Sequence, residues 1–442
     1  MEDVEFARDG SFAYRPGEML IPEGSLERTI DEMAAFAAAA DYEQPKAGAE
    51  RVIEGWVRLE RVPRLLAVID RLRRRGIAAQ PNHVLFATCG CGCGPHPANP
   101  HANPFYANPF YANPFYANPN PGRLISLDAG RRESSARPAV PPTQRTLPDS
   151  AGTVRVTVLD TGFRHEDFDI KDVAHPGHVV VNSASEPSDV PDAPEGTNVA
   201  KDGYLDPAAG HGTFIAGVIQ QITSVCDITV LRVLSTHGVG DEASIAAALE
   251  ALLSDEESRP EFVNLSFGGY SSIGMGTLAD AIQAITAAGT VVVASAGNDG
   301  TCVPMYPAAF PGVVAVAAVD ADDHPADFSN FGPWVRACSL GVDVESAFFE
   351  WNGDEPKQEG VDIDEFEGWA TWSGTSFAAP RVVAALAQWL ADNQGSSPYD
   401  AVEALIDDPD RMRIPMMGTL VKPSGDHWHS VRMATRRRDP GS

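Results

Sequence analysis

The chain has little cysteine, no long apolar segment and no excess of basic residues. Its 442 residues include six cysteines, three of them crowded into CGCGC at 89–93, which is no disulfide framework for a protein of this size. A bridge between Cys302 and Cys338 stays open. No apolar run approaches the length of about 18 residues that a membrane helix needs. Acidic residues outnumber basic ones by 61 to 33, for a net charge of −28, which argues against nucleic-acid binding through phosphate neutralisation and against docking to an anionic membrane.

The first twenty or so residues also lack the pattern of a secretory signal. They carry acids and glycine where such a signal needs a basic start followed by an apolar stretch. We therefore expect a cytoplasmic location. Hydrophobic residues make up 43% of the chain, which is enough for a large core. At about 150 residues per domain, the length predicts roughly three domains, or one large α/β domain with attachments.

Composition divides the chain into four segments. Residues 1–88 predict a small α+β unit, in which strand and helix patterns follow the order β-α-β-α-β with room for one more strand. Residues 89–150 form a linker rich in Cys, Pro and Asn. Residues 151–395 predict a large domain of alternating strands and helices, and residues 396–442 predict one short helix and a polar tail.

The segment 151–395 alternates short apolar runs with helical stretches. The runs VRVTVLD, DITVLRVL, FVNLSFG, TVVVAS and VVAVAAV are bounded by Gly, Asp or Asn. Continuous apolar strands that alternate with helices predict an α/β fold, with a parallel sheet covered by helices on both faces. Functional groups in such a sheet gather at the carboxyl ends of the strands, and the polar motifs of this chain fall there.

The linker contains the repeat ANPFY at 102–106, 107–111 and 112–116. A proline every five residues prevents a regular helix or a central strand, which favours an extended spacer. A cleavable or recognised segment is the alternative, because Phe-Tyr pairs are bulkier than a spacer requires. The preceding C-x-C-x-C spacing is poor for one tetrahedral zinc ion, so we expect a flexible or redox-active loop and assign no metal there. The soft ligands concerned are Cys89, Cys91, Cys93, His96 and His101.

Three motifs place a carboxylate, an imidazole and a hydroxyl at the ends of predicted elements. VTVLDTGF puts Asp160 at the end of a strand, GHGTFIAGVI puts His211 in the first turn of a helix, and SGTSFAAPRVVAALA puts Ser376 at the start of a long apolar helix. A serine hydroxyl needs an imidazole to take its proton, and the imidazole needs a carboxylate to fix its tautomer. Each motif alone also fits a cap or a turn. Together, in an order known for this constellation, they predict a Ser-His-Asp catalytic site.

A fourth polar residue completes this site. TVVVASAGNDG places Asn298 directly after a buried strand. Its side-chain amide can donate to a developing oxyanion, together with the backbone N–H of Ser376 at a helix N-terminus. An asparagine in a turn with positive φ is the structural alternative, and the neighbouring motifs favour the oxyanion role.

With these residues the chain resembles the subtilisin-like serine proteases, the subtilases, over residues 151–395. The resemblance implies a seven-stranded parallel sheet with helices on both sides, and hydrolysis of a protein or peptide substrate through an acyl-enzyme without a required cofactor. It gives Asp160, His211 and Ser376 the triad roles and Asn298 the oxyanion role. Phe377 stands where many relatives have Met, and we expect either side chain to fill a pocket under the helix.

The motif NLSFGG at 264–269 resembles the family's substrate-binding edge. The resemblance implies that Ser266 and Gly268 pair with the substrate backbone as an added strand. Gly268 and Gly269 would leave room for the P1 side chain, which precedes the scissile bond, and ASAGN would form the opposite wall. The substrate-binding residues implied in this way are Ser266, Phe267, Gly268, Gly269, Ser295, Ala296 and Gly297.

Residues 1–88 are similar in element order to the ferredoxin-like propeptides of subtilases, which implies a folding chaperone and intramolecular inhibitor. A usual propeptide ends in a short tail that lies in the active site, whereas residues 89–150 intervene here. A zymogen cleaved in the linker and a permanently attached regulatory or substrate-binding domain therefore both stay open. Family members often bind structural calcium. Asp169 and Asp172 could serve, but no spacing typical of a calcium loop is present and no residues are assigned.

Other functional readings also remain. The acidic stretch 343–372 predicts either a solvated surface hairpin or a rim of the cleft that selects basic or aromatic substrates. The whole chain could be a catalytically silent binding protein that recruits partners through the ANPFY repeats. It could also be a processing protease that matures one particular peptide or protein.

Overall fold

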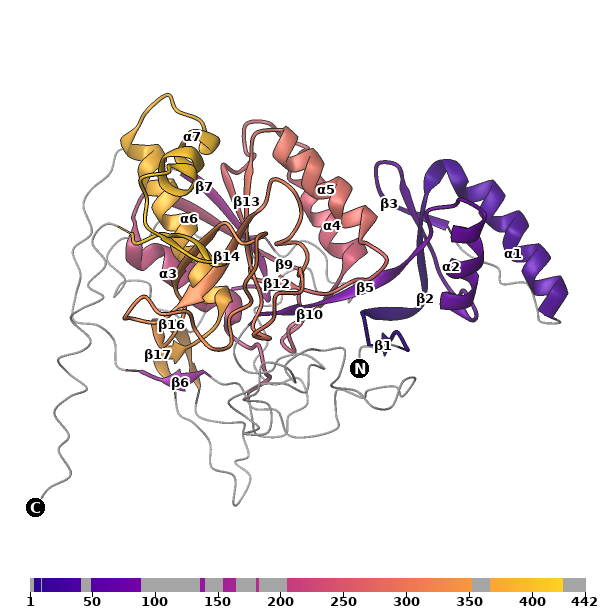
Figure 1. Cartoon of the computed structure of the whole chain (residues 1–442), viewed down its shortest axis with the longest axis horizontal. Helices are drawn as coiled ribbons and strands as arrows, with labels where there is room; N and C mark the ends of the chain where they lie inside the picture. The colour runs from indigo at the N-terminus through magenta and orange to yellow at the C-terminus, as the bar shows by residue number, and fades with distance from the viewer. Residues whose placement is uncertain are drawn as a thin grey trace, which may run out of the picture.

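The computed structural model of the chain describes residues 4–8, 10–40, 49–88, 136–139, 154–163, 180–182, 205–351 and 366–423. The cysteine cluster at 89–93, the ANPFY repeats, and Asp169 and Asp172 lie outside the described residues. Figure 1 shows an N-terminal unit (residues 4–88) beside a large region (residues 154–423). Within the described part of the chain, no helix combines the length and the apolar character needed to cross a membrane.

The large region is built on a nine-stranded sheet of order β18-β19-β15-β14-β13-β11-β7-β9-β8. Neighbouring strands run parallel except β18 and β19. The expected seven parallel strands correspond to the run from β15 to β8, but β18 and β19 extend the sheet beyond residue 395, where we expected only a helix and a polar tail. The strands are β7 (Val154–Asp160), β8 (Val180–Asn182), β9 (Cys226–Arg232), β11 (Phe262–Leu265), β13 (Val291–Ser295), β14 (Val314–Val319), β15 (Ala337–Leu340), β18 (Arg413–Ile414) and β19 (Gly418–Leu420).

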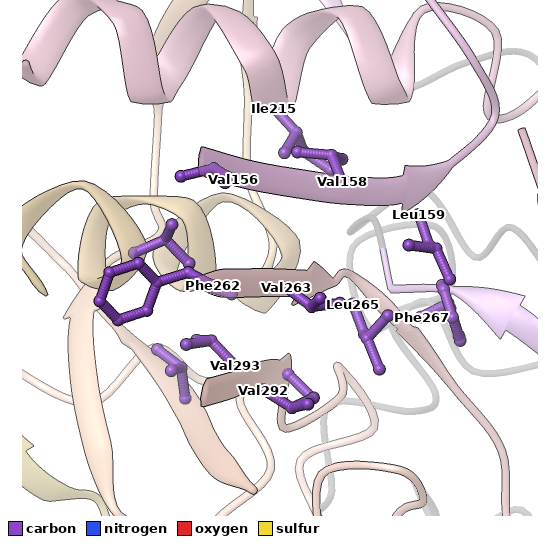
Figure 2. Close-up of a cluster of buried hydrophobic side chains, with 14 of the residues drawn as sticks. Val156, Val158, Leu159, Ile215, Phe262, Val263, Leu265, Phe267, Val292 and Val293 are labelled. Carbon is purple, nitrogen blue, oxygen red and sulfur yellow. The ribbon is translucent and has the colours of Figure 1, made fainter. Parts of the chain in front are cut away.

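Helices cover both faces of this sheet, as the apolar runs predicted. Figure 1 shows α3 and α6 on one side of the strands and α4 and α5 on the other. Every residue of β11, β13 and β14 is buried, because neither face meets water. Figure 2 shows Ile215 of α3 against Val156 and Val158 of β7. The helices are α3 (His211–Ile222), α4 (Glu242–Ala251), α5 (Gly276–Ala287), α6 (Thr375–Asp392) and α7 (Pro398–Val402), the last followed by a π-helical turn at Glu403–Asp407.

The N-terminal unit is an antiparallel sheet with helices packed on it. Its strands are ordered β5-β2-β4-β3, with β1 beside β2. The middle strand of the expected β-α-β-α-β order is split by a turn at Gly55, whose φ of 80° suits glycine, and this split supplies the additional strand. Helix α2 packs its apolar stripe on β2 and β5. The elements are β1 (Glu5–Phe6), β2 (Ala13–Pro22), a 3-10 turn (Glu23–Ser25), α1 (Leu26–Ala40), β3 (Ala49–Ile53), β4 (Trp56–Leu59), α2 (Leu65–Arg74) and β5 (Gln80–Ala87).

Strand β5 joins the two parts of the molecule. It pairs with β2 of its own unit and, antiparallel, with two short strands of the large region, β10 (Val239–Asp241) and β12 (Phe267–Gly268). All eight residues of β5 are buried. The end of the N-terminal unit therefore lies inside the large region and brings Thr88, the next residue, to the predicted catalytic residues.

A hairpin packs against α3. It consists of β16 (Val344–Trp351) and β17 (Phe366–Trp372), with β6 (Arg137–Pro138) along β17. Phe348 and Phe349 are fully buried, so the arms of this hairpin do not form the solvated surface hairpin that was one of the two alternatives for this stretch. The acidic loop between the arms, residues 352–365, lies outside the described residues.

The described cysteines are all free. Cys302 and Cys338 are not bridged, and Cys226 is a buried core residue. Burial raises the pKa of the Cys338 thiol to about 12, so this thiol stays protonated and unreactive near neutral pH.

Candidate active site

Asp160 and His211 form a buried hydrogen-bonded pair. Strand β7 ends at Asp160 and α3 begins at His211, and His211 Nδ1 lies 2.7 Å from Asp160 Oδ1. Both side chains are fully buried. The backbone N–H of Thr161 donates to the same Oδ1 over 2.8 Å and helps to fix the carboxylate. A carboxylate at Nδ1 keeps the proton on that nitrogen and leaves Nε2 ready to accept one.

Aromatic rings enclose the His211 imidazole. The Trp372 ring meets it edge-on, with centroids 5.6 Å apart, and the Phe377 ring lies 5.4 Å away. Phe377 is fully buried and packs on Phe214 with ring centroids 4.6 Å apart, so it fills the pocket under α6 as expected. These contacts restrict the orientation of the imidazole and exclude water from its faces.

Ser376 lies in the first turn of α6 and is fully buried. Its Oγ donates to the carbonyl oxygen of Thr88 and lies 3.1 Å from the carbonyl oxygen of Ser266. Among the described residues, His211 Nε2 has no hydrogen-bond partner. The structure thus pairs Asp160 with His211, whereas the hydroxyl of Ser376 is bonded to Thr88.

Asn298 and Ser376 converge on one carbonyl oxygen. Asn298 Oδ1 accepts from the backbone N–H and the hydroxyl of Thr375, both over 2.9 Å, which leaves the amide nitrogen to face the other way. Asn298 Nδ2 donates to the Thr88 carbonyl oxygen over 2.5 Å, and the Ser376 N–H donates to the same oxygen over 3.3 Å. Sequence analysis missed Thr375 as the residue that orients Asn298. Its only signal was its place in GTS.

The predicted substrate-binding edge is occupied by the chain itself. The N–H of Thr88 donates to the carbonyl of Ser266 over 3.0 Å, and Ala87 pairs with Phe267. On the other side, the N–H of Ala87 donates to the carbonyl of Gly238 over 2.8 Å. Strand β5 is therefore the middle strand between β10 and β12. Sequence analysis did not identify β10, because GVGD carries no apolar run.

The residues expected to form the opposite wall lie beside Thr88, and a side chain occupies the space near Gly268 and Gly297. Ser295 Oγ contacts Thr88 Oγ1, and Ala296 is fully buried. Gly269 is held by a backbone hydrogen bond to Tyr306. The room that we expected between Gly268 and Gly297 for a P1 side chain contains the side chain of Met305, which is a correction to the sequence analysis.

A buried polar network lies behind this wall. The Tyr270 hydroxyl donates to Asp299 Oδ2 over 2.6 Å and accepts from Asn330 Nδ2 over 2.9 Å. Burial and the neighbouring Asp299 carboxylate raise the pKa of Tyr270 well above its usual range, so Tyr270 remains a neutral donor. Asn330 also donates to the carbonyl of Ala296 over 2.8 Å and fixes the wall from behind.

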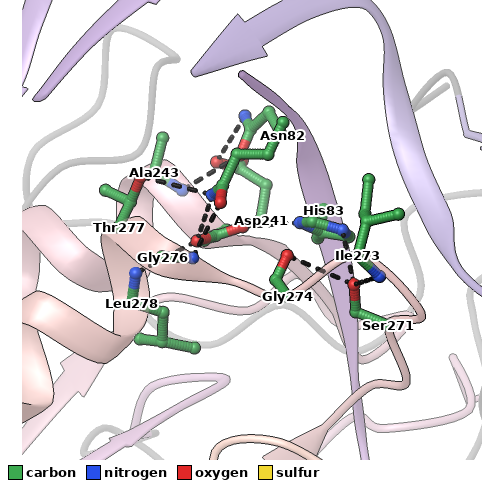
Figure 3. Close-up of polar contacts among 12 residues, drawn as sticks. Asn82, His83, Asp241, Ala243, Ser271, Ile273, Gly274, Gly276, Thr277 and Leu278 are labelled. Atoms are coloured by element: carbon green, nitrogen blue, oxygen red, sulfur yellow. Dashed lines mark hydrogen bonds and ion pairs between the residues drawn. The ribbon is translucent and has the colours of Figure 1, made fainter. Parts of the chain in front are cut away.

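Side chains at the start of β5 bind the N-termini of α4 and α5 (Figure 3). His83 Nδ1 lies 2.6 Å from Glu242 Oε2, and both side chains are fully buried. Gln80 donates to Glu242 Oε1 over 2.7 Å and accepts from the N–H of Gly276. Asn82 accepts from the N–H of Ala243 over 3.0 Å. The N-terminal unit thereby satisfies helix-end donors of the large region.

Calcium finds no fitting site among the described residues. One group of candidate ligands is present there, Asp320, Asp322 and His324, whose ligand atoms lie within 4.8 Å of one another. Asp320 Oδ1 already accepts from the backbone N–H groups of Asp322 and His324, as in a simple turn. Calcium prefers oxygen ligands, and the imidazole offers none.

The sequence of this chain is similar to known proteins over somewhat more than half of its length. The chain is 33% identical over 259 residues to the "Thermophilic serine proteinase" of Bacillus sp. (strain AK1), which covers 58% of this chain and 56% of that protein. It is 30% identical over 244 residues to "Subtilisin Savinase" of Lederbergia lenta, which covers 53% of this chain and 75% of that protein. This chain thus spans little more than half the length of the first of these relatives.

Among solved structures, a cold adapted subtilisin-like serine proteinase is similar over 64% of this chain and 96% of that chain, with 25% identity and a TM-score of 0.46. The sequence pattern of the Subtilase family matches residues 151–416, which include Asp160, His211, Asn298 and Ser376. The match extends past residue 395 and includes β18, in agreement with the extended sheet. The chain belongs to the subtilase family.

Proposed function

We propose that this protein is a serine endopeptidase and that its first substrate is its own peptide bond between Thr88 and Cys89. One observation carries the proposal: the Thr88 carbonyl oxygen accepts from both Asn298 Nδ2 and the Ser376 N–H, while Ser376 Oγ lies against the same carbonyl group. A scissile carbonyl must have these neighbours for attack by a serine. The bond between Thr88 and Cys89 lies at the start of the linker 89–150, in which we expected the cleavage.

The chemistry follows from the residues in place. His211 Nε2 takes the proton of Ser376 Oγ after a rotation of the hydroxyl away from Thr88, and Oγ then bonds to the Thr88 carbonyl carbon. The carbonyl oxygen becomes an oxyanion held by Asn298 and the Ser376 N–H. His211 gives its proton to the amine of Cys89, which leaves, and water then releases Thr88 from Ser376 by the same steps in reverse.

The N-terminal unit would act first as a substrate and then as an inhibitor. Because β5 fills the channel between β10 and β12, no other peptide can pair there while β5 is bound. Turnover of other proteins or peptides then requires the fragment 1–88 to dissociate. A permanently attached regulatory domain remains the rival proposal, since both use the same contacts.

Intact-mass spectrometry of the full chain separates these proposals. The wild type should split into residues 1–88 and 89–442 during incubation, whereas Ser376→Ala should keep its full mass and its fold. A fluorophosphonate probe should label Ser376 of the wild type once the fragment 1–88 has dissociated, because Ser376 is fully buried beneath Thr88 before that. A wild type that keeps its full mass would contradict self-cleavage at Thr88 and support the attached domain, and a wild type that splits and releases residues 1–88 but stays unlabelled would remove Ser376 as the nucleophile.

A further inference from the structure

The space between the two predicted walls of the P1 pocket is closed by one side chain. Met305 is 3% exposed and lies between Gly268 and Gly297. An ideal Cβ placed on Gly297 would lie 2.7 Å from Met305 Sδ, and one placed on Gly268 would lie 3.1 Å from Met305 Cγ and collide with Cε. Met305 can lie there only because both residues are glycines. The space that the two glycines leave is therefore occupied by Met305 and is not open to a substrate side chain.

The backbone that carries Met305 is fixed to the substrate-binding edge. The N–H of Gly269 donates to the carbonyl of Tyr306 over 2.8 Å, and the N–H of Tyr306 donates back to Gly269 over 2.9 Å. The carbonyl of Met305 accepts from the N–H of Ala309 over 2.8 Å. Met305 therefore cannot leave the pocket by a simple movement of a free loop.

The space behind Met305 is also filled. An ideal Cβ on Gly297 would collide with Asn330 Nδ2, which is held in turn by Tyr270 and the carbonyl of Ala296. Asn330 is fully buried. A methionine pushed backwards by a large substrate side chain would have to disrupt this buried polar network, which is costly.

The residue found at the P1 position suits such a closed pocket. Thr88 has a short side chain, whose Oγ1 donates to the carbonyl of Ser266 over 3.1 Å and contacts Ser295 Oγ. The hydroxyl of Ser295 is fully buried and belongs to the wall itself. The side chain of Thr88 therefore meets a carbonyl and a hydroxyl group at this place.

We propose that Met305 closes the P1 pocket and restricts cleavage to bonds that follow a small side chain, such as threonine, serine or alanine. This inference rests on the proposed function, because it names the substrates of the same site. It distinguishes this chain from a protease of broad specificity, since aromatic and long side chains at P1 have no space. Removal of the Met305 side chain should create that space.

The test uses the full chain and its own cleavage site, with intact mass recorded over time. Thr88→Ala should split within about tenfold of the wild-type rate, whereas Thr88→Phe should split at least about 100-fold more slowly. Adding Met305→Ala to Thr88→Phe should restore most of the loss. Met417→Ala, the same change at a buried methionine of the β18–β19 turn, is the matched control and should restore nothing.

The wild type and Met305→Ala, after self-cleavage and release of residues 1–88, are also tested on peptides of the form Leu-Phe-Ala-X-p-nitroanilide, which copy residues 85–87 and vary X among Thr, Ala, Val and Phe. Equal use of Phe and Thr by a labelled wild type would overturn the role of Met305 and leave the endopeptidase intact. Slow use of Phe that Met305→Ala fails to relieve would also overturn it. Absence of both fluorophosphonate labelling and any hydrolysis would refute the endopeptidase and this inference with it.

Discussion

The two ends of β5 are held by different kinds of contact. At its carboxyl end, Ala87 and Thr88 are held by backbone hydrogen bonds, and the short side chain of Thr88 also contacts the predicted active site. At its start, Gln80, Asn82 and His83 are held through their polar side chains (Figure 3). The carboxyl end places the peptide bond after Thr88 at the predicted catalytic residues. The start of the strand binds the N-terminal unit to the large region.

This difference separates catalysis from affinity within one strand. Contacts at Thr88 act on a carbonyl group that changes during the reaction, so their loss should slow cleavage. Contacts at Gln80–His83 do not change during the reaction, so their loss should weaken binding and leave the chemistry alone. The four predictions below test this separation, and all of them use the full chain.

The largest effect is expected for Asn298→Ala. Loss of the Nδ2 donor removes one of the two hydrogen bonds that would hold the oxyanion formed from the Thr88 carbonyl, the other being from the Ser376 N–H, and self-cleavage should slow by about 10²–10³-fold, as for a lost oxyanion donor in another member of this family. Intact-mass time courses measure the rate. Asn393→Ala, an exposed asparagine near the end of α6, is the control and should leave the rate unchanged. An unchanged rate in Asn298→Ala would place the oxyanion elsewhere.

His83→Leu should weaken the binding of β5 and leave the rate of self-cleavage almost unchanged. It removes a 2.6 Å hydrogen bond and leaves a buried oxygen of Glu242 without its partner, which should cost about 1–3 kcal/mol. In a Ser376→Ala background, hydrogen exchange of the β5 amides should accelerate by about 5–150-fold.

Asp70→Ala, on the exposed side of α2, is the control for His83→Leu and should leave exchange unchanged. In the active background, the rate of self-cleavage should stay within about tenfold for His83→Leu, because the strand remains bound most of the time. A strong loss of cleavage with unchanged exchange would contradict the proposed separation of the two ends.

A smaller effect is expected for Asn82→Ala. Asn82 accepts from the N–H of Ala243 and donates to Asp241 and Glu18 over 3.0 and 2.7 Å. Asp241 keeps its own bond from the N–H of Ser244, so the end of α4 stays partly satisfied, and the cost should be about 1 kcal/mol. Hydrogen exchange of β5 measures it. An effect larger than that of His83→Leu would show that the Glu242 carboxylate does not dominate this end.

The sequence predicted the chemical groups of the site better than their neighbours. Asp160, His211 and Ser376 stand where an apolar strand ends or an apolar helix begins, so local pattern and chemistry coincide at each of them. Asn298 was found for the same reason, directly after β13. The fold class could be predicted because the strands are continuous apolar runs, buried on both faces.

The contacts that the sequence did not predict join segments far apart in the chain. Thr88 meets Ser376 across 288 positions, and Met305 lies between Gly268, where room for a P1 side chain was expected, and Gly297 of the expected opposite wall. Strand β16 of the hairpin packs on α3, and the acidic composition of the hairpin gives no sign of this contact. A sequence pattern indicates whether a segment prefers to be buried, but it does not indicate which other segment will cover it.

The smallest effect is expected at Glu18, beside Asn82. Burial is the largest influence on the pKa of Glu18 and raises it, and the nearby Asp241 raises it further. The hydrogen bond from Asn82 and the charges of Arg58 and Arg15 lower this pKa, but the net shift is upward. A raised pKa means that the folded state favours the protonated carboxyl, so its contribution to stability is present at low pH and is lost as the pH rises through the folded pKa.

Glu18→Gln stays neutral and can still accept from Asn82. In a Ser376→Ala background, its melting temperature should match that of the parent near about pH 4 and exceed it near about pH 7. A glutamine variant that is less stable at the higher pH would mean that Arg58, 3.7 Å away, outweighs burial and that charge also holds this end of the strand.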